Sequence, residues 1–557
     1  MFRLLAALAA VAAPPDTAHL VLVATTDVHG HATEWDFVAD RPFPGGLTRA
    51  ATVIDSLRAR YPGRVVVLDA GDLLSGDPFA DYYARVAPRD PHPVVQALDL
   101  AGYDVVTPGN HEFDYGVPAF ERATARRTVR IVSGNVRGLP ADTLVFPGYV
   151  VLRRGDVRVG VSGFTTPGVM VWNGKHLRGR IRVAPIEQSA ARLMPALRRE
   201  SDVAVVLVHS GMAGPSSYDT AGVGPEDMAA RLAGLTPKPD VVVVGHSHRE
   251  IVDTVIDGVR FVQPKPYAQT LAVVHVTLRR RFPGDDWRVA RVRGESVPLA
   301  KVPPSPRLGT RLARLRTEVR DWASQSLGEA RGAMPAALAR AQPTAVINLI
   351  HEVQRARTGA QLSSTSAFNL RAGLRDGDIL LRDIFALYPY ENTLRAVRIS
   401  GARLREYLEY SARYFTSDSL GRPALDPAVF GYNYDMVSGA TYDIDLRLPA
   451  GRRIRNLAVR GRPVTPADTF TLAVNSYRQA GGGGFTMLRD APVVYDRDQN
   501  IRDLLIQEVR ARRVVDPAEL AESNWRILPP EAAARVRGLF GAPPAATPVR
   551  PAGTVLA

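Results

Sequence analysis

The chain of 557 residues carries a formal charge of +14, with 46% apolar and 23% charged residues, the composition of a globular protein. At about 100–200 residues per domain, this length predicts two to four domains, each able to bury a core. Because cysteine is absent, disulfides, thiolate metal sites and thiol catalysis are excluded, and any metal must be held by His, Asp, Glu or Asn.

The N-terminus is typical of an export signal. Arg3 precedes an apolar stretch over 4–12, and residues 10–12 (AVA) offer a small-residue cleavage site. The stretch is too short to span a bilayer, and no later stretch approaches 18 unbroken apolar residues. We therefore expect a signal peptide over 1–18 and a periplasmic or secreted protein with no stable membrane span. The alternative is an uncleaved N-terminus that serves as an anchor.

Residues 19–300 alternate short β-branched runs with amphipathic helical patterns, which predicts a layered α/β domain. Five strand-like runs lie at 20–24, 65–68, 105–107, 203–208 and 241–244. Pro303 and Pro304 are followed by a charged helical pattern over 308–330. We expect a linker helix within 301–340.

A second α/β unit, which would bind the substrate, is expected over 341–530. It contains a helical pattern around 404–414, strand-like runs at 442–446 and 471–474, and the glycine run 481–484. Pro529 and Pro530 close it. The Ala- and Pro-rich end of the sequence predicts a disordered tail over 531–557.

Each of the five strand-like runs in 19–300 leads into side chains that can bind a metal. Sites in layered α/β folds gather beyond the carboxyl ends of strands, so these segments are expected to converge on one point. Glycines beside the polar residues allow sharp turns and a close approach of the backbone. The candidate ligands are Asp27, His29, Asp72, Asn110, His209, His246 and His248.

These residue types suit a pair of divalent cations. Two cations about 3.5–4 Å apart repel each other and need a bridging anion, which the carboxylate of Asp72 can supply. One shell would be completed by Asp27, His29 and one of the paired histidines His246 and His248, and the other shell by Asn110, His209 and the second paired histidine.

The segments resemble the ordered motifs of calcineurin-like metallophosphoesterases: 26–30 (TDVHG), 71–72 (GD), 109–112 (GNHE), 209–211 (HSG) and 245–248 (GHSH). The resemblance implies an N-terminal β-sandwich flanked by helices and two divalent metal ions, for which Zn, Mn, Co and Fe suit the ligands about equally. His111 matches the non-ligand histidine that faces the scissile phosphate. The resemblance assigns Asp27, His29, Asp72 and His248 to one ion, and Asp72, Asn110, His209 and His246 to the other.

The implied reaction is phosphoester hydrolysis by in-line attack of metal-bound hydroxide, because a metal lowers the pKa of bound water to about 7. His111 can stabilise the developing charge and protonate the leaving oxygen. Asp114 can orient the imidazole and raise its pKa. The alternative role for Asp114 is an N-terminal helix cap.

A narrower resemblance, to the exported 5′-nucleotidase family, spans about residues 19–530. In the first unit it rests on 45–49 (GGLTR) and 109–116 (GNHEFDYG), and in the second on 387–394 (LYPYENTL), 399–401 (ISG) and 442–445 (YDID). It implies that small nucleotides are cleaved to nucleoside and phosphate, and that the second unit is a 5′-nucleotidase-type C-terminal domain that binds the nucleoside.

Several stretches are most similar to the periplasmic 2′,3′-cyclic-nucleotide 2′-phosphodiesterase/3′-nucleotidase branch: 71–78 (GDLLSGDP), 432–435 (YNYD), 475–478 (NSYR) and 524–526 (NWR). Gly483 stands where the 5′-nucleotidase branch usually carries an aspartate, which also favours the cyclic branch. Asp114, however, is typical of the 5′-nucleotidase branch. A 5′-nucleotidase or UDP-sugar hydrolase therefore stays the alternative.

The expected nucleoside contacts lie in the second unit. Two tyrosines form a natural base clamp because every base offers a π-face, and glycines let the backbone approach a ligand. An arginine matches the family's substrate-binding position, although the glycines usual before it are replaced by 366–370 (SAFNL). The candidates are Tyr432 or Tyr434, Tyr477, Arg371, Gly482 and Gly483.

The net charge would also suit a polyanion-binding surface. However, only four of the 70 basic residues are lysine, the arginines run through the whole chain, and no recognised DNA- or RNA-binding motif occurs. We therefore expect small nucleotides and no nucleic acid as partners. A catalytically dead nucleotide-binding surface protein is the alternative from a different class, and the complete ligand set argues against it.

Overall fold

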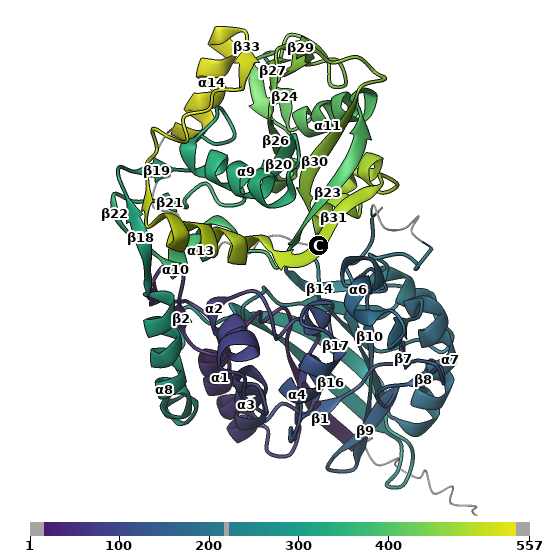
Figure 1. Ribbon diagram of the computed structural model, residues 1–557. Helices are drawn as coiled ribbons and strands as arrows, with labels where there is room; N and C mark the ends of the chain where they lie inside the picture. Colours follow the sequence, from purple (N-terminus) through teal and green to yellow (C-terminus); the bar gives the residue numbers. More distant parts are fainter. Residues whose placement is uncertain (1–15, 215, 217–221, 542–557) are drawn as a thin grey trace, which may run out of the picture.

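The computed structural model describes residues 16–214, 216 and 222–541. Two domains are stacked end to end, the first drawn in purple to teal and the second in green to yellow (Figure 1). Residues 1–15, most of the expected signal peptide, lie outside the described residues. Strand β1 (Asp16–Thr25) begins at Asp16, which pairs with Arg280, so residues 16–18 belong to the folded domain and not to a signal.

Two six-stranded sheets make up most of the first domain, and all five expected strand runs lie in them. The strand orders are β17-β16-β1-β4-β5-β6 and β14-β15-β13-β12-β10-β9. Besides β1, the first sheet comprises β4 (Val65–Asp69), β5 (Val105–Val106), β6 (Arg130–Ile131), β16 (Thr270–Arg280) and β17 (Arg288–Pro298). The second comprises β9 (Tyr149–Arg154), β10 (Val157–Thr165), β12 (Val203–His209), β13 (Val241–Val244), β14 (Ile251–Ile256) and β15 (Val259–Gln263).

Alternate side chains of each strand face opposite layers, which explains the unbroken apolar runs in the sequence. In β1, Leu20 and Leu22 pack between the sheets, whereas Val21 and Val23 pack against the outer helices. One sheet is covered by α1 (Leu47–Arg60), α3 (Pro93–Ala101) and α8 (Pro306–Ala323), and the other by α7 (Ile186–Glu200). The expected β-sandwich flanked by helices is confirmed.

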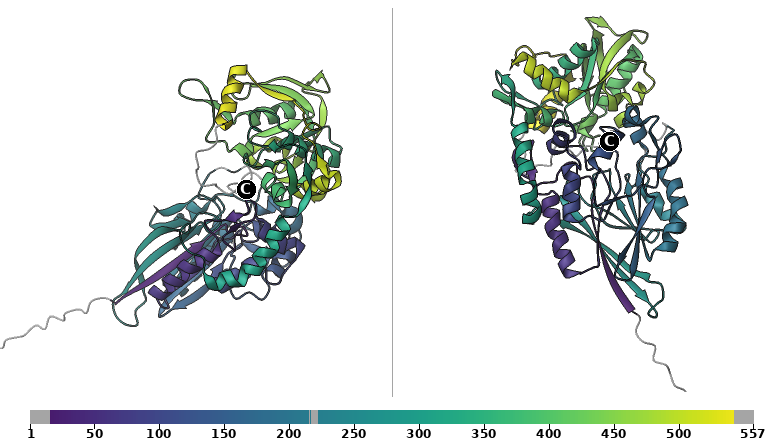
Figure 2. Two further views of the ribbon diagram at one scale, coloured as in Figure 1. Left: turned by 90° about the vertical axis from the view of Figure 1, so that its left-hand side faces the viewer. Right: turned by 60° about the horizontal axis from the view of Figure 1, so that its bottom comes forward.

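Parallel pairing brings the functional strand ends to one edge. β1 pairs in parallel with β4, and β4 with β5; in the other sheet β10 pairs in parallel with β12, and β12 with β13. The carboxyl ends of these strands point toward the second domain (Figures 1 and 2). Any site built on them therefore lies next to the domain interface.

The second domain is also α/β, as expected. Its five-stranded sheet has the order β26-β20-β30-β23-β31, and a four-stranded sheet has the order β29-β28-β27-β33. The strands are β20 (Leu362–Ser366), β23 (Thr393–Ser400), β26 (Asp435–Ser438), β27 (Ala440–Asp445), β28 (Ile454–Val459), β29 (Arg462–Pro463), β30 (Thr469–Asn475), β31 (Val493–Asn500) and β33 (Trp525–Leu528). The main helices are α9 (Ala345–Thr358), α10 (Leu381–Leu387), α11 (Gly401–Ala412) and α13 (Ile501–Arg512).

The linker helix is shorter than the sequence pattern indicates. Helix α8 ends at Ala323, and residues 326–330 form β18 (Ser326–Ala330), which pairs with β22 (Gly377–Leu380) and β32 (Val514–Val515) of the second domain. Glycine is unfavourable inside a helix. At Gly328 a Cβ would also lie 2.7 Å from the carbonyl oxygen of Arg513, so this position requires glycine for the strand to pack.

The expected disordered tail over 531–557 is wrong for its first part. Residues 530–541 form α14 (Pro530–Gly541), whose Ala532, Ala533 and Val536 are buried in the core of the second domain. The spacing of these three residues places them on one helix face, and Pro530 suits the first turn of a helix. Residues 542–557 lie outside the described residues.

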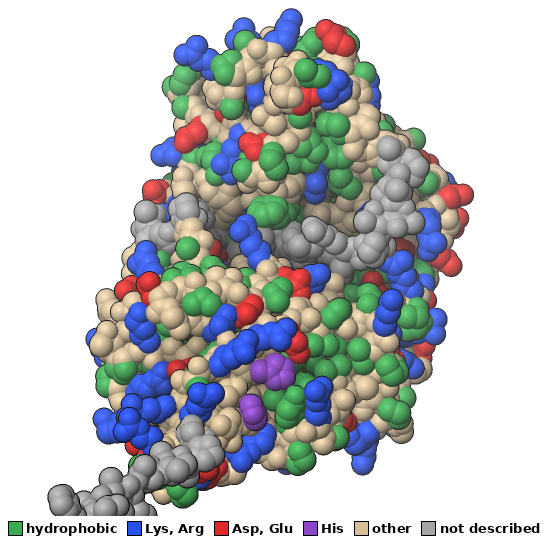
Figure 3. All heavy atoms as spheres, turned by 180° about the vertical axis from the view of Figure 1, so that it is seen from behind, with side chains coloured by type: hydrophobic (Ala, Val, Ile, Leu, Met, Phe, Trp, Pro, Cys, Tyr) green, Lys and Arg blue, Asp and Glu red, His purple; other side chains and the backbone are tan. Residues whose placement is uncertain are grey.

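Within the described part of the chain, every helix is too short or too polar to cross a membrane. Lysine and arginine side chains on the face seen in Figure 3 are spread over both domains among polar and apolar ones. This distribution agrees with a general preference for arginine along the sequence.

Candidate metal centre and substrate pocket

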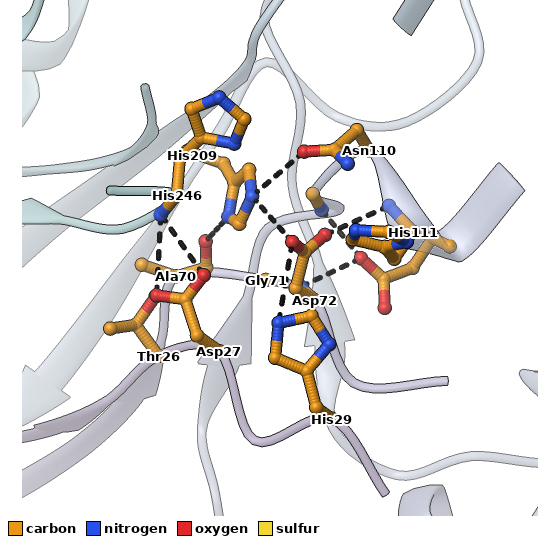
Figure 4. Close-up of polar contacts among 12 residues, drawn as sticks. Thr26, Asp27, His29, Ala70, Gly71, Asp72, Asn110, His111, His209 and His246 are labelled. Atoms are coloured by element: carbon orange, nitrogen blue, oxygen red, sulfur yellow. Dashed lines mark hydrogen bonds and ion pairs between the residues drawn. The ribbon is translucent and has the colours of Figure 1, made fainter. Parts of the chain in front are cut away.

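The five strand ends converge as predicted and bring the candidate ligands into one cluster. Figure 4 labels all of these ligands except His248. Asp27 and His29 follow β1, Asp72 follows β4, Asn110 follows β5, His209 ends β12, and His246 and His248 follow β13. Five of the seven have a left-handed backbone: Asp27, His29, Asp72, His246 and His248, with φ between 46° and 72°. Such strain persists only where the surroundings over-determine it, and it gathers at functional sites.

One group of three donors comprises Asp27, His29 and His248, whose ligand atoms lie within 4.8 Å of one another. The Nε2 atoms of His29 and His248 are 3.0 Å apart, and Asp27 Oδ1 lies 3.3 Å from His248 Nε2. His29 Nδ1 donates to the carbonyl of Ser75 at 2.8 Å, which leaves Nε2 as the lone-pair nitrogen. Burial lowers the pKa of His29 to about 3, so its imidazole is neutral.

A second group comprises Asp72, His209 and His246. His209 Nε2 lies 2.9 Å from Asp72 Oδ2 and 3.1 Å from Asn110 Oδ1, and its Nδ1 donates to the carbonyl of Ala70 at 2.8 Å. Asp72 Oδ2 also lies 3.8 Å from His29 Nε2, so this carboxylate faces both groups. Asp72 therefore occupies the place expected of a shared ligand.

The donor set fits divalent cations. The side chains of Asp27 and His209 are fully buried, and oxygen and imidazole acceptors meet at distances where only protons or cations can separate them. His29 and His209 each direct Nδ1 to a backbone carbonyl, an arrangement usual for metal-binding histidine because it leaves Nε2 for the ion. The structure therefore contains a clustered site whose donors suit divalent metal.

A buried carboxylate that the sequence reasoning left without a role fixes the geometry of this centre. Glu112 accepts backbone N–H groups from Asp72 at 2.9 Å, Leu73 at 2.6 Å and Leu74 at 3.3 Å after β4, and from Gly109 at 2.6 Å after β5. It therefore ties together the two segments that carry the ligands following β4 and β5. Its place in the GNHE motif was the one available signal.

His111 and Asp114 form the expected pair. His111 Nδ1 lies 2.7 Å from Asp114 Oδ2, and Asn173 Nδ2 donates to the other carboxylate oxygen at 2.9 Å. Burial opposes the charged imidazolium, but Asp114 and Asp72 outweigh it and raise the pKa of His111 to about 10. The next helix, α4 (Val117–Ala123), has Gly116 at its N-cap position, so the helix-cap alternative for Asp114 does not hold.

A pocket open to solvent lies between the domains next to this centre. Asn110, His111 and Asp114 line it from the first domain, together with Trp172 and Asn173, which the sequence reasoning missed. The second domain contributes four aromatic side chains, Phe368, Tyr390, Tyr432 and Tyr477. Two of these, Phe368 and Tyr390, were also missed, because only the domain packing brings them to the pocket.

Of the residues expected to contact the nucleoside, only some lie at the pocket. Tyr432 and Tyr477 both line the pocket. Tyr434 does not: it is 1% exposed and stacks on Tyr414 in the core, with ring centroids 5.2 Å apart. Arg371 is exposed and lies outside the lining of the pocket.

The glycine run supports pocket residues and does not itself line the cavity. A Cβ on Gly482 would lie 2.5 Å from the ring of Tyr477, and a Cβ on Gly483, whose φ is +67°, would lie 2.4 Å from Nη1 of Arg478. The Arg478 guanidinium is buried against Asp435 at 2.8 Å and donates to the carbonyls of Tyr432 and Gly482. The close approach therefore serves to fix the two tyrosines.

The sandwich and its donor set define a metallophosphoesterase, and comparison with known proteins agrees. Residues 20–250 match the calcineurin-like phosphoesterase family, and residues 326–490 match the 5′-nucleotidase C-terminal domain. The chain belongs to the 5′-nucleotidase family of metallophosphoesterases, and it is a metal-dependent phosphoric ester hydrolase.

Relatives match most of the chain and not one domain alone. A 2′,3′-cyclic-nucleotide 2′-phosphodiesterase/3′-nucleotidase of Haemophilus influenzae is 30% identical over 92% of this chain and 87% of its own length. The trifunctional nucleotide phosphoesterase protein YfkN of Bacillus subtilis is 26% identical over 92% of this chain, which spans only 39% of YfkN. A Staphylococcus aureus structure, provisionally named a 5′-nucleotidase, has a TM-score of 0.80 at 26% identity and covers 92% of this chain and 100% of that one.

Replacing Glu112 by glutamine should destabilise the fold. The amide would present donors to backbone N–H groups that now meet carboxylate oxygen, and a hydrogen bond to a charged group contributes about 1.5–3 kcal/mol. Urea denaturation should therefore show at least this loss in the free energy of unfolding. Glu121→Gln, an exposed position on α4 (Val117–Ala123), is the matched control. Equal midpoints for both variants would contradict the role of Glu112.

Proposed function

We propose that the protein hydrolyses small nucleotides to nucleoside and phosphate with two divalent cations, as a 2′,3′-cyclic-nucleotide 2′-phosphodiesterase/3′-nucleotidase. The observation that carries this proposal is the composition of the pocket. Asn110 and His111 of the candidate metal centre share one cavity with four aromatic side chains of the other domain. A nucleotide suits this pocket, because its phosphate can lie at the metal centre while its flat base stacks on the aromatic side chains.

The seven side chains would hold two ions of the Zn, Mn, Co or Fe type. When bound, the two cations would lower the pKa of a coordinated water to about 7 and neutralise charge on the phosphoryl oxygens. One ion would take Asp27, His29, Asp72 and His248, and the other Asp72, Asn110, His209 and His246.

His111 would act on the leaving oxygen. Its Nδ1 is engaged by Asp114, so Nε2 is the nitrogen left to contact a substrate in the pocket. Asp114 favours the imidazolium form of His111 and raises its pKa, so the imidazole can carry a proton to give to the departing nucleoside. Asn173 would keep Asp114 in the orientation that His111 requires.

Tyr477 and Tyr432 would hold the base. Phe430 stacks on Tyr432 with ring centroids 5.2 Å apart and planes 10° apart, so one face of Tyr432 is already covered by protein. Gly482 lets the backbone lie against Tyr477. We propose the division of labour that the sequence indicates, with metal chemistry in 19–300 and nucleoside binding in 341–530.

The cyclic-nucleotide branch is supported by the name of the Haemophilus influenzae relative and by Gly483 in the glycine run. A 5′-nucleotidase or UDP-sugar hydrolase is the second candidate, favoured by Asp114 and by the name of the Staphylococcus aureus structure. A catalytically dead nucleotide-binding protein would need a damaged metal centre, and the presence of all seven candidate ligand residues in the sequence argues against one.

Phosphate release from 5′-AMP, 3′-AMP and 2′,3′-cyclic AMP decides between these candidates. After chelation, turnover should be absent and should return when a divalent metal is added, with 3′-AMP and the cyclic substrate preferred. A preference for 5′-AMP would select the 5′-nucleotidase. Nucleotide binding without any release would select the dead binding protein.

His111→Ala should keep metal and nucleotide binding but lower kcat by about 10²–10⁴-fold, the usual contribution of a general acid.

Tyr477→Ala should raise KM about 5–150-fold, because base stacking contributes about 1–3 kcal/mol. Tyr477→Phe keeps the ring and should bind nearly as the wild type does. Tyr434→Phe is the matched control in the core. A KM for Tyr477→Ala equal to that of the wild type would place the base elsewhere.

We also propose that the protein is exported through its N-terminal segment. The argument is the charge and apolar pattern over 1–12 and the start of β1 at Asp16. N-terminal sequencing of the protein from its native host should find the first residue between 13 and 16, after the small-residue site and before β1. A chain that begins at Met1 would support the anchored alternative.

A further inference from the structure

His246 is held in place by four neighbouring residues: Asp27, Trp172, His209 and Glu226. Its backbone N–H donates to the carboxylate of Asp27 at 3.0 Å. Trp172 stacks over the imidazole with ring centroids 5.6 Å and planes 25° apart, and His209 meets it edge-on at 5.2 Å. Its Nε2 lies 2.9 Å from Oε1 of Glu226, whose side chain is 6% exposed.

Glu226 is itself fixed by the strand end that carries His209. The hydroxyl of Ser210 donates to the backbone carbonyl of Glu226 at 2.5 Å and accepts from the backbone N–H of Met228 at 3.0 Å. The backbone N–H of Gly211 donates to Asp227 at 2.9 Å. Residues 226–228 are therefore fixed by hydrogen bonds to Ser210 and Gly211, and the carboxylate of Glu226 extends from this fixed segment to His246.

We propose that Glu226 is a positioning residue. It would orient His246 toward the metal ion that His246 is proposed to bind together with Asp72, Asn110 and His209. This inference rests on the proposed two-metal function. A carboxylate at Nε2 holds the proton there, so Nδ1 keeps its lone pair for the ion and becomes a better donor. In Figure 4 one ring nitrogen of His246 points toward Asn110 and the other away from it, as this role requires.

Glu226, Asp227 and His246 also form a group whose ligand atoms lie within 4.8 Å. The hydrogen bonds favour positioning over a third ion. Oε1 of Glu226 faces Nε2 of His246, Oε2 accepts the hydroxyl of Ser216, and Asp227 accepts the backbone N–H of Gly211. Both carboxylates are therefore engaged by protein donors.

The test is a calorimetric titration of the metal-stripped full chain with Mn²⁺. The wild type should show two binding events. Glu226→Ala should weaken one of them about 10–100-fold, the usual effect of removing such an outer partner, and leave the other unchanged. Glu226→Gln keeps the shape but removes the charge, and it should weaken the same event. Glu187→Gln, an exposed position on α7, is the control and should match the wild type.

Thermal unfolding separates positioning from a merely structural role. The metal-free Glu226→Gln protein should melt as the metal-free wild type does, and only its stabilisation by Mn²⁺ should shrink. Wild-type affinities in Glu226→Gln would overturn the inference, as would a third binding event that this variant loses, since Glu226 would then be a ligand. A wild type that binds no metal would instead refute the proposed function, so the two failures are distinguishable.

Discussion

The close approach of buried acceptors at five strand ends is the constraint on which this structure depends. Asp27, Asp72 and His209 are almost completely buried, and their oxygen and nitrogen atoms lie about as close as hydrogen bonds allow. Burying such groups without a compensating charge costs free energy. Bound cations would supply the positive charge that these buried acceptors need. The surrounding hydrogen bonds hold this arrangement in place. Backbone carbonyls fix the imidazoles of His29 and His209, and the carboxylate of Glu112 fixes the segments that follow β4 and β5.

The same constraint explains why glycine and left-handed residues crowd these segments. A Cβ on Gly109 would lie 2.2 Å from Oδ1 of Asp72, and one on Gly245 would lie 2.4 Å from Oγ1 of Thr26. Both glycines therefore admit the side chains that form or support the centre. Each ligand with a positive φ costs stability, and the apolar layer between the two sheets supplies the rigidity that keeps it there.

The strands and the metal ligands could be predicted because both are local features of the sequence. A run of Val and Leu predicts a buried strand, and a polar residue at its carboxyl end predicts a place at the sheet edge. The pocket lining could not be predicted in the same way, because Trp172 and Phe368 belong to different domains and line one pocket only when these domains pack. Tyr432 and Tyr434 are alike in sequence, and only tertiary packing places one in the pocket and the other against Tyr414. The burial of α14 likewise depends on a distant surface that accepts its apolar face.

The domain interface that completes the pocket is held by charges that the two domains share. Arg85 lies 3.3 Å from Asp81 of its own domain and 3.7 Å from Glu391 of the other, and it also pairs with Asp503. Arg502 pairs with Glu391 within the second domain and lies 3.6 Å from Asp81 across the interface. Because the side chain of Arg502 is almost fully buried, separating it from its carboxylates would leave a charge without compensation. Glu391 also lines the pocket. The same side chain therefore takes part in the ion pairs that align the domains and in the surface that faces the substrate.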